Sequence, residues 1–160
     1  MEENEFITKS VRETEDLGQK LAHNFRIGNV VILTGELGAG KTTFVQGVAK
    51  ALNIKGRVIS PTFILLRRHR ARIKNHKSLR QGSGRARIMN LYHIDLYRLE
   101  NSEEIKNLGL EEIFKDSNGI FFIEWGEKHE ELKASWEINF EILSKDRRRI
   151  TMWDSREVPS

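Results

Sequence analysis

The segment GELGAGKTT, from Gly35 to Thr43, has residue types and spacing that suit phosphate binding. It matches G-x-x-x-x-G-K-[ST], in which a glycine-rich turn points successive backbone N–H groups at an anion. Lys41 would bring a positive charge to the β- and γ-phosphates, and Thr42 would offer its hydroxyl to Mg²⁺. The residues expected to hold the nucleotide are Glu36, Leu37, Gly38, Ala39, Gly40, Lys41, Thr42 and Thr43.

Mg²⁺ bound to a nucleotide usually needs a second protein contact, an acidic residue at the end of a neighbouring buried strand. The apolar run from Ile120 to Ile123 ends at Glu124, which we predict to be that residue. A strand that simply surfaces at a polar residue would look the same. The chain has no N-K-x-D guanine reader, and the D-x-x-G match from Asp116 to Gly119 precedes an apolar strand instead of following one. ATP is therefore the expected nucleotide.

The segment HIDLYR, from His93 to Arg98, is the most unusual feature of the chain. In an extended conformation His93, Asp95 and Tyr97 share one face, because successive side chains alternate. Such a polar face could position an attacking water or hold metal-bound waters. An edge strand with a solvated face has the same pattern, so spacing alone leaves both readings open.

The elements around the glycine-rich loop have the order that a phosphate loop requires. Ser10 and Glu13 have capping-box spacing, and apolar residues then recur every four positions, which predicts a helix over about 11–26. Asn29 to Thr34 is a β-branched run typical of a buried strand. An amphipathic pattern follows the loop as far as Asn53.

The remaining segments predict an α/β fold. Met89 to Leu99 is expected to be extended, Asn101 and Glu104 to cap a helix, and Trp136 to Trp153 to form a β-hairpin. We therefore expect a three-layer P-loop NTPase-like domain with a mixed, mainly parallel central sheet and a C-terminal β-hairpin. At 160 residues, one domain spanning 1–160 is the natural size.

Composition limits the classes of protein that the chain can be. It has no cysteine, which excludes a disulfide framework and a thiolate metal site. The polar start is unlike a secretory signal, and no apolar run is long enough to span a bilayer, so we expect a cytoplasmic protein without a membrane partner.

The net charge of +4 is unevenly distributed. Residues 67–87 hold nine of the 27 Lys and Arg residues and no acid, which leaves 18 basic against 23 acidic residues elsewhere, or −5. We interpret residues 67–87 as a basic, mostly mobile insert. It could contact tRNA phosphates weakly, or be a solvated loop without a partner; it contains no aromatic residue for base stacking.

The chain resembles TsaE (YjeE), a family of small bacterial P-loop ATPases. The resemblance is carried, in chain order, by GELGAGKTT, SPTF (60–63), LYHIDLYRL (91–99), LGLEE (108–112) and FIEW (122–125). It implies a role in making threonylcarbamoyladenosine next to the anticodon of tRNA. TsaE proteins bind the TsaB–TsaD complex, and their ATP hydrolysis is thought to reset or activate that complex.

The resemblance also implies roles for individual residues. Thr42 and Glu124 would bind Mg²⁺, Thr62 would be a switch threonine sensing the γ-phosphate, and Asp95 would be the acid needed for hydrolysis. Residues expected at the site, the partner surface or the adenine are Trp125, Tyr97, Arg147 and Arg148. This chain departs from the family in its longer segment between SPTF and HIDLYR, and in having Gly126 after the Glu-Trp pair.

Two other functions remain open from the residues alone. A small-metabolite kinase could use the same loop, with the arginine-rich insert as a lid over phosphates. A nucleotide-gated RNA-binding module would bind ATP without releasing phosphate.

Overall fold

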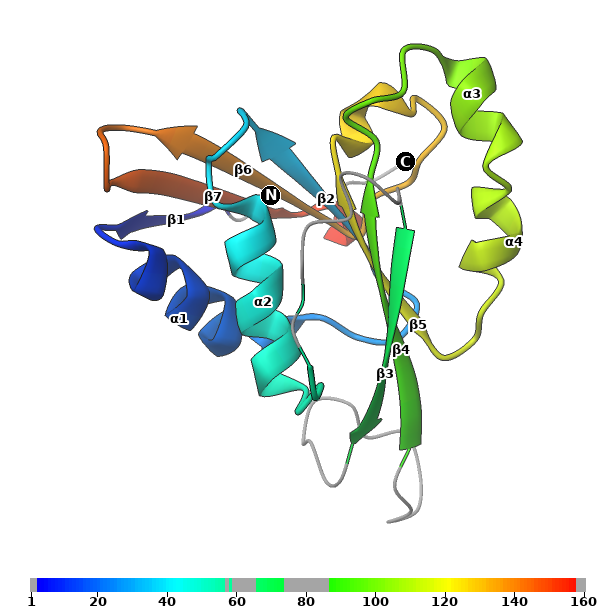
Figure 1. Ribbon diagram of the computed structural model, residues 1–160, viewed down its shortest axis with the longest axis horizontal. Coiled ribbons are helices and arrows are strands. Elements are labelled where there is room, and N and C mark those ends of the chain that lie inside the picture. The colour runs from blue at the N-terminus through cyan, green and yellow to red at the C-terminus, as the bar shows by residue number, and fades with distance from the viewer. Residues whose placement is uncertain (1–2, 57, 59–65, 74–86, 158–160) are drawn as a thin grey trace.

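The computed structural model describes residues 3–56, 58, 66–73 and 87–157, in which one sheet lies between two layers of helices (Figure 1). The strands are β1 (Glu3–Thr8), β2 (Val30–Gly35), β3 (Leu66–Ile73), β4 (Arg87–Asp95), β5 (Gly119–Glu124), β6 (Trp136–Ile142) and β7 (Arg148–Asp154). The α-helices are α1 (Val11–Leu21), α2 (Lys41–Ala51), α3 (Ser102–Asn107) and α4 (Leu110–Phe114), and the 3₁₀ turns are η1 (Ala22–Asn24), η3 (Gly126–Lys128) and η4 (Ser155–Glu157). No helix in these ranges is long and apolar enough to cross a membrane.

The sheet has the strand order β1-β7-β6-β2-β5-β4-β3. The central pairings, β6 with β2, β2 with β5 and β5 with β4, are parallel, whereas the outer pairings are antiparallel. The predicted mixed α/β fold and the C-terminal hairpin β6–β7 are confirmed. Parallel pairing predominates only at the centre, because β1 and β3 add antiparallel pairs at both edges.

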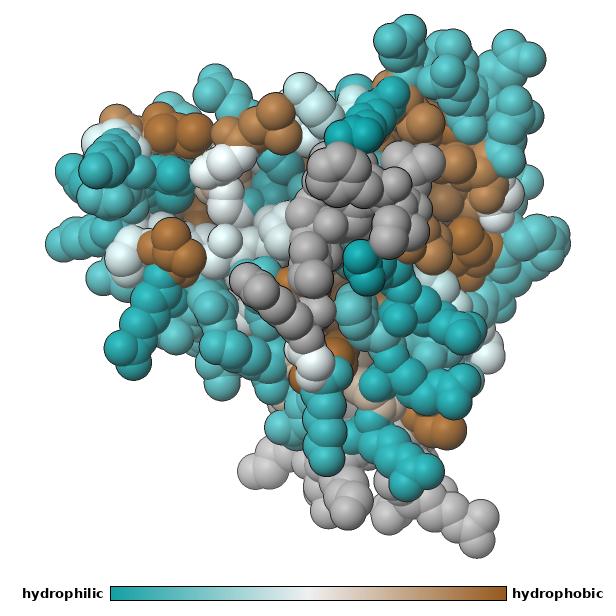
Figure 2. Space-filling model, viewed as in Figure 1, coloured by the Kyte–Doolittle hydropathy of each residue, from teal (hydrophilic) through white to brown (hydrophobic). Residues whose placement is uncertain are grey.

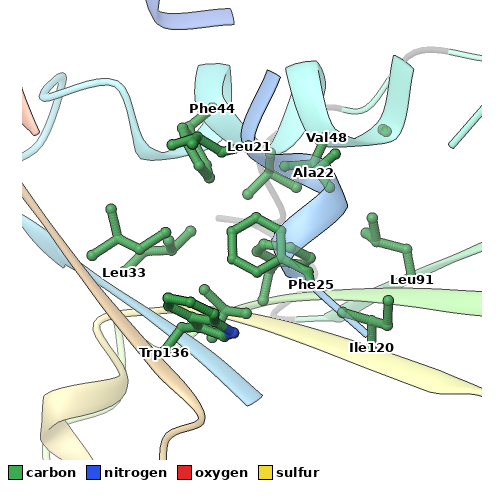
Figure 3. Close-up of a cluster of buried hydrophobic side chains, with 14 of the residues drawn as sticks. Leu21, Ala22, Phe25, Leu33, Phe44, Val48, Leu91, Ile120 and Trp136 are labelled. Carbon is green, nitrogen blue, oxygen red and sulfur yellow. The ribbon is translucent and has the colours of Figure 1, made fainter. Parts of the chain in front are cut away.

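Helices α1 and α2 cover one face of the sheet over the larger core. Phe25 lies at the centre of that core in Figure 3, and its ring meets those of Phe44, Phe122 and Trp136 edge-on at centroid distances of 6.3, 5.2 and 6.0 Å. The two helices touch through glycine: a Cβ on Gly47 would overlap the backbone carbonyl of Glu15. Helix α2, which begins at the phosphate loop, is thereby fixed against α1.

Helices α3 and α4 cover the opposite face over a smaller core that includes Ile94, Ile105 and Ile123. The single helix expected after Asn101 is two helices. Asn101 does cap the first, since its side chain accepts a hydrogen bond from the Glu104 amide at 2.9 Å. Gly109 then interrupts the helical path with a φ of +67°.

The N-terminal region differs from its prediction in two ways. Residues 3–8 form the edge strand β1, which was not predicted. Most of its side chains are exposed, so its sequence does not show the alternation of apolar and polar residues expected of a half-buried strand. The helix expected over 11–26 ends at Leu21 and continues as the short turn η1.

The prediction that the basic insert is a mostly mobile loop is wrong for the first third of the insert. Residues 67–73 belong to β3, which pairs antiparallel with β4 along its whole length. Buried Ala71 and half-buried Arg67 and His69 alternate with exposed arginines, so the strand pattern is present but made of charged residues. Most of the rest of the insert, 74–86, lies outside the described residues.

Candidate nucleotide-binding site

The phosphate loop and the predicted acids meet at the carboxyl ends of the parallel strands. In the sheet register Glu124 of β5 lies beside Leu33 of β2 on one side and Asp95 of β4 on the other. Ligands of open α/β sheets bind at this edge, outside the strand ends. Residues 82 positions apart in sequence, Thr42 and Glu124, thus come into contact.

The loop after β2 has the backbone shape of an anion cradle. Gly38 and Gly40 have φ values of +76° and +105°, a region that residues with side chains rarely adopt. Gly40 is the N-cap of α2 and supplies no side-chain cap, so the first N–H groups of the helix are open to an anion. Leu37 is 58% exposed at the tip of the loop, and its side chain is turned away from the core.

Lys41 is held at the centre of the site, with only 4% of its surface exposed. Its ammonium group donates hydrogen bonds to the carbonyl oxygens of Gly35 and Glu36 at 2.5 and 2.8 Å. Burial lowers the pKa of Lys41, and the nearby carboxylates, led by Glu124 and Asp95, oppose that shift. A bound triphosphate would supply negative charge where burial disfavours the lysine cation.

Glu124 is buried and accepts two hydrogen bonds on one oxygen. Its Oε1 lies 2.7 Å from the Thr42 hydroxyl and 2.8 Å from His93 Nε2. Burial alone would raise the pKa of Glu124, but His93, the Thr42 hydroxyl and the charge of Lys41 together hold it below its usual value. The group is therefore an ionised carboxylate at neutral pH.

The HIDLYR segment is not a solvated edge. Its strand β4 lies between β5 and β3, and His93 and Asp95 are 0% and 3% exposed. His93 and Asp95 lie two residues apart on β4 and so share one face of the strand, but Tyr97 lies in the turn after the strand. The Tyr97 amide donates to Asp95 Oδ1 at 2.9 Å, which holds the aspartate side chain at the strand end.

Trp125 lies beside the ammonium group of Lys41. Its ring centroid is 4.8 Å from Lys41 Nζ and 5.1 Å from the ring of Tyr97. A φ of +59° turns the chain sharply after Glu124, and the Trp125 amide donates to the Leu33 carbonyl at 3.0 Å. The tryptophan thus forms an aromatic wall of the site, in contact with its cation.

A small cavity of about 70 Å³ opens beside the phosphate loop. It is formed by the start of α1, the loop and the β6–β7 turn, with Thr43 and Arg148 in its lining. Arg148 donates to the Gly38 carbonyl at 3.2 Å, whereas Arg147 is exposed and does not line the cavity. Of the two hairpin arginines, the structure brings Arg148 to the loop.

The donor chemistry at Thr42 and Glu124 fits Mg²⁺, which prefers oxygen ligands and keeps waters and substrate phosphates in its coordination shell. Within the described ranges no group of three His, Cys, Asp or Glu side chains could hold a metal by itself. The two oxygen donors therefore suit a metal that arrives with a nucleotide. Thr62, the predicted switch residue, lies outside the described residues.

Sequence reasoning missed two contributors to this geometry. His93 was recognised as part of a polar face but was not counted among the site residues, and only its pairing with Glu124 gives it a role. Arg148 was considered only together with its neighbour. Its 3.2 Å contact to Gly38 depends on hairpin register, which residue types alone do not specify.

Comparisons with known proteins show which family the chain belongs to. Residues 8–151 match the family model described as threonylcarbamoyl adenosine biosynthesis protein TsaE. The tRNA threonylcarbamoyladenosine biosynthesis protein TsaE of Synechocystis is 36% identical over 139 residues, covering 84% of this chain and 78% of the relative. The Streptomyces coelicolor TsaE is 42% identical over 119 residues, covering 73% of this chain and 70% of the relative.

A solved structure shows the same fold. The crystal structure of Bacillus subtilis YdiB superposes with a TM-score of 0.67 and 26% sequence identity, covering 96% of this chain and 86% of that one. Together with the family match over most of its length, these relatives show that the chain belongs to the TsaE family of tRNA threonylcarbamoyladenosine biosynthesis proteins.

Proposed function

We propose that the protein binds ATP with Mg²⁺ and hydrolyses it in support of the TsaB–TsaD complex during threonylcarbamoyl modification of tRNA. The observation that carries the proposal is the 2.7 Å contact between the Thr42 hydroxyl and Glu124 Oε1 beside Lys41. Both residues were predicted as Mg²⁺ ligands from separate parts of the sequence. Their meeting at a phosphate loop is the arrangement that P-loop hydrolases use.

Binding would depend on the loop and the start of α2. The backbone N–H groups between Gly38 and Thr43 would surround the phosphates, and the Lys41 ammonium would neutralise part of their charge. Arg148 and the start of α1 border the cavity next to the loop, so the nucleoside end of ATP would extend toward them. The Trp125 ring would close the opposite side around Lys41.

Hydrolysis would depend on the buried acids of β4 and β5. Mg²⁺, when bound with the nucleotide, would stabilise the charge that develops on the phosphate oxygens. Glu124 and Thr42 would hold its position, and Asp95, on the strand next to Glu124, would orient the attacking water. His93 keeps the Glu124 carboxylate fixed through its 2.8 Å hydrogen bond.

A partner requirement is consistent with what the site exposes. Leu37 in the loop and Tyr97 beside Trp125 are 58% and 38% exposed, so two large side chains with apolar surface lie open to solvent next to Lys41. A partner covering the site could bury both. We therefore expect slow turnover by the protein alone and faster turnover with TsaB–TsaD.

The test measures ATP hydrolysis with and without TsaB–TsaD, together with nucleoside analysis of tRNA from cells depleted of the protein. Partner-stimulated phosphate release and loss of threonylcarbamoyladenosine would support the proposal. Rapid hydrolysis that the partner does not change would remove the partner role, and retained modification would remove the pathway role. Transfer of the γ-phosphate to a hydroxyl acceptor would identify a kinase instead.

A further inference from the structure

A groove far from the phosphate loop is lined, among the described residues, by Asn53, Lys55, Arg70 and Arg72. Its volume is about 500 Å³, and it lies at the outer edge of the sheet, where β3 meets the chain that leaves α2. Helix α2 has its first residue in the phosphate loop and 11 residues in all, which is about 16 Å of helix. The groove and the nucleotide site are therefore at opposite ends of α2.

The three cations of the groove have no acidic partners among the residues that the structure describes. Arg68, on the same strand, differs: it interacts with the Tyr92 hydroxyl and lies near the Asp116 carboxylate. Lys55, Arg70 and Arg72 make no ion pair or side-chain hydrogen bond within the described ranges. Their charge is therefore available to an external anion.

The spacing of the groove favours an extended polyanion. Arg70 and Arg72 are two residues apart on one strand, so their Cα atoms are about 7 Å apart on the same side of β3. Neighbouring phosphates along a nucleic acid strand have a similar separation. Lys55 adds a third cation from another part of the chain, which a single small anion would not require.

The lining also favours nucleic acid over an acidic protein. The core of a protein interface is built from apolar and aromatic residues, and among charged residues only arginine is enriched there. The described lining of this groove has no apolar side chain, and the surface over β3 is largely hydrophilic (Figure 2). No aromatic side chain offers a stacking surface for bases, which indicates contact with the phosphate backbone and not with base sequence.

We infer that Lys55, Arg70 and Arg72 form a binding groove for the phosphate backbone of RNA, separate from the nucleotide site. The choice of RNA rests on the family's role in tRNA modification and not on ATP hydrolysis. The groove adds a sequence-independent, salt-sensitive contact, so that an RNA strand and a nucleotide occupy opposite ends of α2 at the same time.

The test is fluorescence anisotropy of an unmodified tRNA transcript with the full-length protein across a series of KCl concentrations. Replacing both arginines, Arg70→Gln with Arg72→Gln, should reduce the slope of log K against log salt by about 1.5, because each lost phosphate contact lowers it by about 0.7–0.9. Arg70→Lys with Arg72→Lys should keep the slope. Both arginines have exposed side chains, so the variants should fold.

The matched control is Lys106→Gln with Lys115→Gln, which removes the same charge from the α3–α4 layer. These lysines pair with Glu131 at 3.5 Å and Glu112 at 2.6 Å, so their loss should leave the slope unchanged. Equal effects of the groove and control variants would overturn the inference. The inference would also be overturned if the Arg70→Gln, Arg72→Gln variant lost binding to TsaB–TsaD but kept its RNA binding. Displacement of RNA from the natural protein by an equal concentration of inorganic phosphate would overturn it as well.

The result is independent of the proposed ATPase. Lys41→Ala should weaken ATP binding and leave the salt dependence of RNA binding unchanged. The Arg70→Gln, Arg72→Gln variant should reduce the salt dependence of RNA binding and leave ATP binding unchanged. If the arginine variant loses ATP affinity to the same degree as RNA affinity, the groove is not a separate site. Failure of hydrolysis in every variant would count against the proposed function alone.

Discussion

His93 Nε2 lies 2.8 Å from Glu124 Oε1, the same oxygen that accepts the Thr42 hydroxyl. Both side chains are almost completely buried, and they belong to neighbouring parallel strands. One carboxylate oxygen is thus fixed by two donors, so the orientation of Glu124 depends on β4 as well as on α2. This pairing connects the HIDLYR segment to the phosphate loop.

Replacing His93 by Phe should remove a donor to a buried carboxylate while filling similar space. We expect a loss of about 1–3 kcal/mol in stability, since the acceptor is left with one partner fewer, and a higher pKa for Glu124. The affinity for Mn²⁺ with ATP should fall as well. Urea unfolding and titration with Mn²⁺ measure the two effects.

His93→Gln is the matched variant because its side-chain amide can still donate to Glu124. It should recover part of the Mn²⁺ affinity that the Phe variant loses. If Gln and Phe reduce that affinity equally, the hydrogen bond is not what positions the carboxylate.

Lys41 and Asp95 should affect different steps. Lys41→Ala removes charged hydrogen bonds to phosphate and should weaken ATP binding by about 10- to 100-fold. Asp95→Asn keeps the acceptor for the Tyr97 amide, so it should bind ATP nearly as well as the natural protein and hydrolyse it about 100-fold more slowly. Isothermal titration and single-turnover hydrolysis separate the effects, and equal affinity losses would contradict the role of Asp95.

The parts of the site that could be predicted are those that local sequence encodes. The glycine loop needs positive φ at fixed positions, which glycine provides. The apolar run that ends at Glu124 predicts a buried strand with an acidic residue at its end. The meeting of Glu124 with Thr42 follows once both strands are placed in one parallel sheet. The types and spacing of these residues were therefore enough to predict where they lie.

The parts that could not be predicted depend on tertiary context. β3 is rich in arginine, and only its pairing with β4 and the burial of Ala71 make it a strand. The edge strands β1 and β3 carry charged residues, which prevent an exposed edge from pairing with other chains. These charged residues also mask the alternation of apolar and polar side chains by which a strand is recognised in sequence. The role of His93 likewise required the register between β4 and β5.

Gly47 should be sensitive to any side chain because it lies where α2 meets α1. A methyl group there would overlap the Glu15 carbonyl and push the helices apart, so Gly47→Ala should cost about 1–3 kcal/mol in stability. Lys20→Ala, at an exposed position of α1, should change stability by less than about 0.5 kcal/mol. Thermal unfolding compares them, and similar melting temperatures would show that the helices adjust without cost.

Asp116 should give stability an acid-dependent component. Its Oδ2 accepts hydrogen bonds from the Tyr92 hydroxyl at 2.6 Å and from Asn90 at 2.8 Å, and its Oδ1 accepts one from the Asn118 amide at 2.9 Å. These bonds, led by that of Tyr92, lower the pKa of Asp116 in the folded state. A lowered folded pKa stabilises the protein above the unfolded pKa of about 4, and that contribution is lost as the pH falls through the folded value.

Tyr92→Phe tests this because it removes the hydroxyl and keeps the ring that stacks on Phe121 at 5.0 Å. The variant should be less stable than the natural protein at pH 7, and the difference should shrink as the pH falls below about 4. Urea unfolding at a series of pH values measures this difference in stability. The control is Asp116→Asn: in that background the stability lost through Tyr92→Phe should no longer depend on pH. A cost that is the same at pH 3 and pH 7 would mean that the hydroxyl stabilises the fold without acting through the ionised aspartate.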